Sequence, residues 1–257
     1  MTDLDPHHTL DQFIKRLPKA DHRLLILDYD GTLAPFCTDR HKADLYPGVA
    51  PLLTQIHANH IQLAFISGRP AEELRARLPI QGIEIFGSHG HEHLHPNGKL
   101  ELLPLDPSAT KALETLAQSL HDHSLAPILE HKHGGIAIHW RHTTQSRRQQ
   151  LTSLMQEMTR QLPSSVTATA FDGGFEFRTK TYNKGTALLH LLAQQPDTLV
   201  AYLGDDLTDE DAFKALPADG LGILVRPTLR PTHASVWLTP PDELLDFLTI
   251  MATHETL

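Results

Sequence analysis

The sequence predicts an α/β fold: a Rossmann-like core with a parallel sheet, into which an α+β domain is inserted. Two observations support this prediction. Apolar runs that end in Asp or Gly alternate with helical segments near both ends of the chain, whereas the middle carries two hairpin signals. A single cysteine excludes an intramolecular disulfide framework, and 257 residues can bury a sizeable core without one.

The first part of the core comes from residues 23–86. Short runs with Leu and Ile on both faces are typical of strands buried in a parallel sheet, and Pro near the start of the intervening segments favours helices. We expect strands at 23–28, 62–66 and 83–86, and helices at 47–59 and 70–78. This alternation favours right-handed crossovers.

The pattern changes after residue 105. Gly-rich turns at 133–135 and 172–174 each separate two short strands that follow a helix, which indicates an antiparallel sheet with two helices. The expected helices are 108–123 and 145–162, and the expected strands are 127–132, 136–140, 166–170 and 175–178. We therefore predict an inserted domain at 106–179.

The strand–helix alternation returns in the last part of the chain. We expect helices at 184–193, from 209 and from 242, and strands at 199–203 and 221–225. The core domain should accordingly consist of residues 1–105 and 180–257.

Composition excludes several classes of function. A net charge of −9 argues against nucleic acid or an anionic membrane as the main partner. No apolar run approaches the roughly 18 residues of a membrane span, and residues 1–8 are too polar and acidic for a secretory signal. With one cysteine, a reducing compartment is expected. We expect a cytoplasmic monomer.

Two carboxylates, Asp28 and Asp30, follow the first strand directly before a Gly turn. Ligands of open α/β sheets bind at this carboxyl end of the strands. In an extended chain the two side chains project to the same side, and two such charges resist joint ionisation unless a cation binds. The pair indicates a divalent metal site, or a nucleophile beside a proton carrier. The alternative is a turn that Asp30 merely caps.

A second acidic segment follows the strand at 199–203. Five of the seven residues from Asp205 to Asp211 are acidic, and they would repel one another without a cation. Oxygen-rich sites of this kind suit Mg²⁺. The alternative is a helix start capped by Thr208 with acids in its first turn, and both interpretations can hold at once.

Two weaker signals follow other strands and open helices. Ser67 and the free N–H groups beside it could hold a phosphate, although a simple Ser-Gly turn explains the same residues. Lys184 at a helix start is unfavourable with the helix dipole unless a carboxylate or phosphoryl oxygen pairs with it. The alternative for Lys184 is a solvated surface side chain.

Taken in order, these four segments resemble the haloacid dehalogenase-like phosphohydrolases, with the insertion resembling their larger type of cap domain. The strings LDYDGTLAP, SGR, NKG and GDDLTDEDAF carry the resemblance. More narrowly, the chain is similar to the trehalose-6-phosphate phosphatases, through GSHGHE, LEHK, HWR, GGFEFR and again GDDLTDEDAF. The similarity extends from about residue 20 to 250.

The resemblance implies a mechanism. Asp28 attacks phosphorus and forms an aspartyl-phosphate, and Asp30 protonates the leaving oxygen and then activates water. Asp30 would need a raised pKa for this, and its acidic neighbours act in that direction. Ser67 and Lys184 hold phosphoryl oxygens. The implied Mg²⁺ residues are Asp28, Asp30 through its backbone carbonyl, Asp205 and Asp206, with Asp209 in support.

The resemblance also implies residues that bind the substrate, and a cap that selects it. Glu130 and Lys132 are alternate residues of one expected strand and therefore face the same way, with Glu176 on a neighbouring hairpin. Such a polar face suits sugar hydroxyls, although an ordinary solvated sheet face is the alternative. The full implied set is Thr32, Gly68, Arg69, His89, Glu130, Lys132, Arg141 and Glu176.

We therefore expect an Mg²⁺-dependent phosphatase that acts on trehalose 6-phosphate in the final step of trehalose biosynthesis. The alternatives are a phosphatase for sucrose 6-phosphate or mannosyl-3-phosphoglycerate, a phosphosugar mutase, or a non-catalytic sugar-phosphate-binding partner of a synthase. The presence of Asp28, Asp30, Lys184 and Asp205 together favours an enzyme. A trehalose-6-phosphate synthase is the expected protein partner.

Four histidines alternate along the chain, at His89, His91, His93 and His95. A strand would place all four on one face, where they could bind a transition metal. The turn signal Pro-Asn-Gly at 96–98 instead favours an exposed hairpin. The metal site remains the alternative.

Overall fold

The computed structural model of the chain describes residues 6–37, 42–141, 143–171 and 173–253. It divides into two compact units, which we call the core unit (residues 1–101 and 183–257) and the inserted unit (residues 102–182). The insertion predicted at 106–179 lies inside the second unit. Within the described ranges, no helix combines the length and apolar character that a membrane span needs.

The core unit contains an eight-stranded sheet, and the predicted Rossmann-like architecture is confirmed. Its first six strands in spatial order pair in parallel, while β3 and β4 pair antiparallel. The strands in spatial order are β12 (Val236–Leu238), β11 (Leu221–Val225), β10 (Thr198–Gly204), β1 (His22–Leu27), β2 (Gln62–Ile66), β3 (Glu84–Gly87), β4 (Glu92–Leu94) and β5 (Leu100–Leu102).

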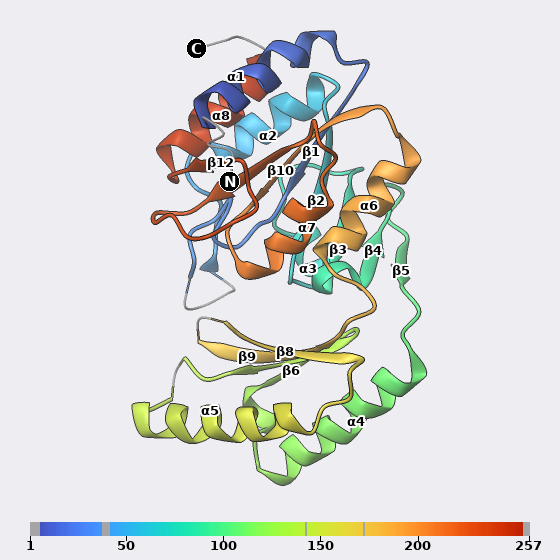
Figure 1. Cartoon of the computed structure of the whole chain (residues 1–257), viewed down its shortest axis with the longest axis vertical. Helices are drawn as coiled ribbons and strands as arrows, with labels where there is room; N and C mark the ends of the chain where they lie inside the picture. Colours follow the sequence, from blue (N-terminus) through green and yellow to red (C-terminus); the bar gives the residue numbers. More distant parts are fainter. Residues whose placement is uncertain (1–5, 38–41, 142, 172, 254–257) are drawn as a thin grey trace. The chain divides into compact units, whose positions relative to one another are not determined.

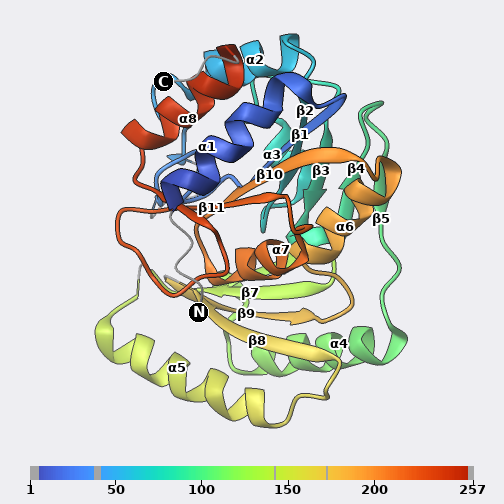
Figure 2. The same ribbon diagram turned by 45° about the horizontal axis from the view of Figure 1, so that its top comes forward.

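Helices cover both faces of this sheet (Figure 2). One face packs against α1 (Pro6–Arg16), α2 (Val49–Ala58), α3 (Ala71–Arg75) and α8 (Asp242–Thr253). The other face packs against α6 (Lys184–Gln194) and α7 (Glu210–Ala215). Short 3₁₀ turns are η1 (Leu17–Lys19), η3 (Ser88–Gly90) and η5 (Leu207–Asp209).

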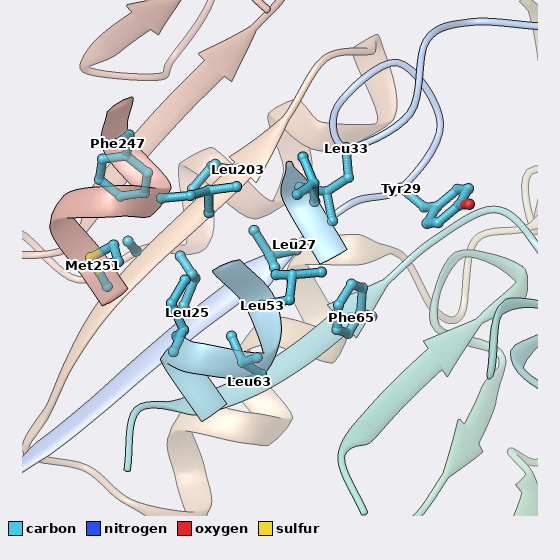
Figure 3. Packing of buried hydrophobic residues seen from close by; sticks show 14 of the residues in the cluster. Leu25, Leu27, Tyr29, Leu33, Leu53, Leu63, Phe65, Leu203, Phe247 and Met251 are labelled. Atoms are coloured by element: carbon cyan, nitrogen blue, oxygen red, sulfur yellow. The ribbon is translucent and has the colours of Figure 1, made fainter. Parts of the chain in front are cut away.

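Strand β1 lies in the middle of the core and is apolar on both sides. Leu25 and Leu27 point into the cluster that Figure 3 shows, together with side chains of α2 and α8. Leu24 and Ile26 point to the opposite face, toward α6. Each fully buried Leu or Ile contributes about 1.5–3 kcal/mol, so this strand anchors the site that begins at its last residue.

The inserted unit is a four-stranded antiparallel sheet with two helices on one face (Figure 1). Side chains at alternate positions, such as Ile136, Ile138 and Phe177, pack against the helices, which leaves the intervening polar residues on the other face. Its elements are α4 (Pro107–Asp122), η4 (Ala126–Ile128), β6 (Leu129–Lys132), β7 (Gly135–His139), α5 (Gln145–Arg160), β8 (Val166–Phe171) and β9 (Gly174–Thr179), with the strand order β6-β7-β9-β8.

The exposed hairpin expected around the histidine run is wrong for its first strand. His93 is only 2% exposed, because β4 is an internal strand between β3 and β5, and His91, directly before this strand, is 1% exposed. Only β5 is exposed, and the turn at 96–98 does connect the two strands. The short strands β4, β5 and β12 and the helix α1 are additions to the elements expected from the sequence.

Candidate active site

Neighbouring parallel strands bring the acidic segments together. Leu27 at the end of β1 lies opposite Leu203 in β10, so the chain leaves both strands at the same edge of the sheet. The N–H of Asp28 donates a hydrogen bond to the carbonyl of Leu203 at 2.9 Å, which fixes the two loops against each other. Strand β2 runs parallel on the other side of β1 and leads to Ser67 at the same edge.

Three buried carboxylates meet at this edge. Asp28, Asp205 and Asp209 each offer an oxygen within 4.8 Å of the others. Burial, and then repulsion by the neighbouring acids, raises the pKa of Asp28 to about 7, although Lys184 opposes the shift. Burial and the charge of Asp28 likewise raise the pKa of Asp205 well above its usual value. A cation would relieve both the desolvation and the repulsion.

One oxygen of this cluster is available for a ligand. Within the described residues, Asp205 Oδ1 is buried and has no hydrogen-bond partner. The backbone at Gly31 packs directly against the same carboxylate: a Cβ there would lie 2.2 Å from Asp205 Oδ2, and the φ of +82° favours glycine. The Asp-Gly turn after β1 therefore leaves the space that the Asp205 carboxylate occupies.

Lys184 neutralises part of the cluster. Its Nζ lies 3.0 Å from Asp28 Oδ1 and 2.7 Å from Asp209 Oδ1, and the side chain is almost fully buried. Burial lowers the pKa of Lys184, but the charges of Asp209 and Asp28 outweigh it, so the net shift is upward and the side chain stays cationic. A capping box between Asn183 and Thr186 begins α6 and so places Lys184 in its first turn.

Asp209 supports the site from behind. It is fully buried and accepts four hydrogen bonds, from Lys184 Nζ, from Tyr202 Oη at 2.5 Å, and from the N–H groups of Asp205 and Asp206 at 3.1 and 2.9 Å. Because both of its oxygens are occupied, Asp209 acts better as a support than as a metal ligand. Gly204 allows this approach, since a Cβ there would lie 2.3 Å from the Asp209 carboxyl carbon.

The helix start in this segment differs from the expected one. Asp206, rather than Thr208, is the N-cap of η5, and its Oδ1 accepts from the N–H of Leu207 at 2.7 Å. The Asp206 carboxylate therefore caps η5 and is not one of the three carboxylates of the cluster. Its metal-binding role stays a prediction.

Sequence reasoning missed an arginine that braces this loop. Arg230 donates to the carbonyl of Asp206 at 2.7 Å and to that of Asp205 at 3.3 Å, and it pairs with Glu210. The Glu210 carboxylate also accepts from the N–H and the ring of His233. Only the acidic member of this group lies in the GDDLTDEDAF string, so no local pattern pointed to the other two.

Asp30 has a different partner from Asp28. Its carboxylate accepts two hydrogen bonds from the Arg69 guanidinium, from Nε at 2.6 Å and Nη2 at 2.5 Å, while Nη1 pairs with Glu73. The Arg69 guanidinium also lies over the ring of Tyr29. The acidic surroundings expected of Asp30 are thus countered by a cation.

The loop after β2 packs against the segment after β3. His89 donates its N–H to the carbonyl of Ser67 at 2.9 Å, and the His89 ring leaves no room for a Cβ on Gly68. Glu92, which sequence reasoning did not single out, accepts from Ser88 Oγ at 2.6 Å and from the N–H of Ala71 at 2.8 Å. These contacts fix Ser67, which is buried, at the edge of the sheet.

Thr32 is a second buried polar group at this edge of the core. Its side chain is fully buried, and its Oγ1 finds no hydrogen-bond partner among the described residues. A buried hydroxyl without a partner costs free energy, which a bound polar ligand would recover.

The polar residues predicted in the inserted unit share one face of its sheet. The register places Glu130 and Glu176 on either side of Ala137, away from the helix-packed face. Lys132 Nζ donates to Glu176 Oε1 at 2.8 Å, and the Glu130 carboxylate pairs with His139 at 2.8 Å. The Arg141 side chain lies against Gly173, where a Cβ would collide with it. These residues form a paired, charged surface within the unit.

Comparison with known proteins gives a consistent picture. Residues 26–241 match the trehalose-phosphatase family. The trehalose-phosphate phosphatase of Mycobacterium bovis is 31% identical over 241 residues, which cover 89% of this chain and 61% of the relative. That of Mycobacterium marinum is 30% identical over 242 residues, 90% of this chain and 61% of the relative. The chain thus spans about three-fifths of the length of these relatives.

Solved structures agree on the fold. The C-terminal domain of the C. albicans trehalose-6-phosphate phosphatase superposes with a TM-score of 0.79 at 22% identity, and the match covers 97% of each chain. The Aspergillus fumigatus trehalose-6-phosphate phosphatase gives a TM-score of 0.66 at 25% identity over 98% of each chain. A haloacid dehalogenase-like hydrolase from Bacteroides thetaiotaomicron gives 0.67 at 16% identity, covering 89% of this chain and 99% of that one.

Proposed function

Because the chain belongs to the trehalose-phosphatase family, we propose that it hydrolyses trehalose 6-phosphate to trehalose and inorganic phosphate. The observation that carries the proposal is the cluster of Asp28, Asp205 and Lys184 at the carboxyl edge of the sheet, braced by Asp209. A buried carboxylate beside a buried cation and an unpartnered oxygen is suited to a phosphate ester and a divalent ion.

The donor set fits Mg²⁺. Asp28 and Asp205 are hard oxygen ligands, the Asp205 Oδ1 atom is buried without a partner, and both carboxyls are destabilised as anions without a cation. We propose that these two side chains hold the ion, with the backbone carbonyl of Asp30 as a further ligand. When bound, Mg²⁺ neutralises phosphoryl charge and polarises a phosphoryl oxygen.

Asp28 is the proposed nucleophile. One of its oxygens attacks phosphorus, the bond from phosphorus to the sugar oxygen breaks, and an aspartyl-phosphate forms. Lys184, which already contacts Asp28 Oδ1 at 3.0 Å, offsets the negative charge of the phosphoryl group, and Ser67 and Thr32 donate hydrogen bonds to it. Asp209 keeps Lys184 in place throughout.

Asp30 is the proposed proton carrier. Its carboxylic acid protonates the departing sugar oxygen, and the resulting carboxylate then takes a proton from the water that attacks the aspartyl-phosphate. This second attack releases inorganic phosphate and restores the Asp28 carboxylate. In the ligand-free chain the Arg69 guanidinium pairs with Asp30, and the dianionic substrate competes for that guanidinium.

The inserted unit is the proposed source of sugar specificity. Glu130, Lys132 and Glu176 occupy one sheet face and already exchange hydrogen bonds within it or with His139. A site built from such charged donors and acceptors rejects ligands that lack matching hydroxyls. Arg141 and His89 complete the proposed substrate set, with Gly68 giving the backbone close access.

The test is phosphate release by the full chain from trehalose 6-phosphate, sucrose 6-phosphate, mannosyl-3-phosphoglycerate, glucose 6-phosphate and an aryl phosphate, with Mg²⁺ or EDTA. We expect preference for trehalose 6-phosphate, loss in EDTA, and loss in Asp28→Asn and Asp30→Asn but not in the exposed control Asp197→Asn. Preference for another sugar overturns the substrate. No release from any of them by folded protein overturns catalysis and favours a sugar-phosphate-binding partner of a synthase.

Lys132→Met tests the specificity role separately. We expect a higher KM for the sugar phosphate and an unchanged kcat/KM for the aryl phosphate, because Lys132 belongs to the inserted unit and not to the acidic cluster. Equal losses on both substrates contradict the role. A cytoplasmic monomer that works with a trehalose-6-phosphate synthase stays part of the proposal.

A further inference from the structure

We propose that the core unit carries a second metal site, for a divalent transition ion of the Zn²⁺ class, formed by Glu84, His93 and His95. Each of the three side chains offers one ligand atom, and these atoms lie within 4.8 Å of one another. The set is independent of the acidic cluster, since it involves none of Asp28, Asp205 or Lys184.

The strand register explains why the three side chains meet. His93 on β4 lies opposite Phe86 on β3, and alternation along antiparallel strands places Glu84 and His95 on the same face as that pair. His93 Nε2 lies 2.5 Å from Glu84 Oε2, so the imidazole and the carboxylate already converge. This face is the one that α6 covers.

The surrounding side chains hold the ligands in place. The His93 ring stacks on Phe86 with centroids 4.1 Å apart, and His190 of α6 packs edge-on to it at 5.3 Å. The ring of His95 lies 3.8 Å from that of His93. The carboxylate of Glu101 contacts His95 Nε2 at 3.1 Å and restrains its ring, as carboxylates around metal sites do.

The donor set selects the kind of ion. Two imidazoles and one carboxylate suit Zn²⁺ and related ions, whereas Mg²⁺ prefers oxygen ligands alone. Glu84 and His93 are buried, but the His95 side chain is 29% exposed, which gives the ion a path from solvent and leaves a coordination position for water.

The test is a titration of the tag-free full chain with Co²⁺ in excess Mg²⁺, followed by visible absorption and by displacement with Zn²⁺. We expect one site per chain that His95→Gln weakens by about tenfold or more. His95 is the first choice because it is partly exposed and its replacement leaves the buried pair intact. The matched control is His57→Gln, which replaces an exposed histidine on α2. This change should leave the Co²⁺ affinity within about twofold of the wild-type value.

Two further variants separate the possible results. Glu84→Gln, which keeps the size of the side chain, should weaken Co²⁺ binding as His95→Gln does, while Asp205→Asn should not change it. Equal binding by wild type and His95→Gln overturns the site, and so does equal weakening by His57→Gln, which would mean scattered surface histidines. Loss of binding in Asp205→Asn would place the ion at the acidic cluster and also overturn it.

Discussion

Replacing Asp209 by Asn should destabilise the core unit more than any exposed Asp-to-Asn change. The substitution keeps the size of the side chain but removes its charge and turns one of its two acceptor atoms into a donor. In the structure both oxygens face donors: Lys184 and Tyr202 on one, and two backbone N–H groups on the other. One pair of donors must therefore lose its acceptor.

The size of the effect follows from burial. Asp209 is fully buried, and the Lys184 side chain is 3% exposed, so solvent screens their attraction little. Each buried donor left without an acceptor costs about 1–3 kcal/mol, and breaking a buried ion pair costs about 3–5 kcal/mol. Since these costs overlap, we expect a loss of about 3–5 kcal/mol. For a unit of this size that lowers Tm by about 6–20 °C.

Urea and thermal unfolding of the full chain in EDTA measure the change directly. Tyr202→Phe removes one of the four donors and should cost about 0.5–1.5 kcal/mol. The exposed Asp197→Asn controls for the loss of a carboxylate and should stay within about 0.5 kcal/mol. An Asp209→Asn chain that unfolds within about 1 kcal/mol of wild type would refute the view that this carboxylate holds Lys184 in place.

Three other outcomes are expected. Gly31→Ala should lower Tm more than Gly98→Ala. Both positions have φ near +82°, but only at residue 31 does the new Cβ meet the Asp205 carboxylate, at 2.2 Å. Equal shifts of Tm in thermal scans would contradict this. Burial raises the pKa of Glu210, but hydrogen bonds from Arg230 and His233 outweigh it and hold the pKa at about 2, against 4.5 when unfolded. Stability present above pH 4.5 should therefore be lost as the pH falls through 2, and acid titration of Glu210→Gln should lack this loss. The pKa of Asp28 is raised to about 7 in the folded chain, against 3.8 when unfolded, so in EDTA the chain should become less stable as the pH rises from about 4 through 7. Mg²⁺ should restore stability at the upper end of this range. A flat stability profile in EDTA would count against the buried cluster.

The sequence was sufficient for the elements that position the site. Strands β1, β2, β10 and β11 are apolar on both faces, and that pattern arises because helices cover both sides of the sheet. The residues that follow these strands could be placed at one edge of the sheet from the sequence alone, since the carboxyl ends of parallel strands lie at the same edge. The acidic cluster follows from that rule, whereas Lys184 begins α6 after the inserted unit and was expected at the site only from the family resemblance.

The short elements could not be predicted in the same way. Strands β4, β5 and β12 have three residues each, too few for a period-two pattern to stand out. His91 and His93 look polar in the sequence, but neighbours on both sides bury them, and burial by distant segments leaves no local signal. Tyr202, Glu92 and Arg230 were missed for a related reason, because each acts through a partner that only the fold brings near.

The position of β1 in the sheet has a consequence for how the chain reaches its native state. One edge of β1 pairs with β2, which begins at Gln62, but the other pairs with β10, which begins at Thr198. During synthesis this apolar strand therefore keeps one backbone edge open until β10, which begins at Thr198, has been made. Open, apolar strand edges can pair with other chains, so this order of appearance exposes the nascent protein to self-association.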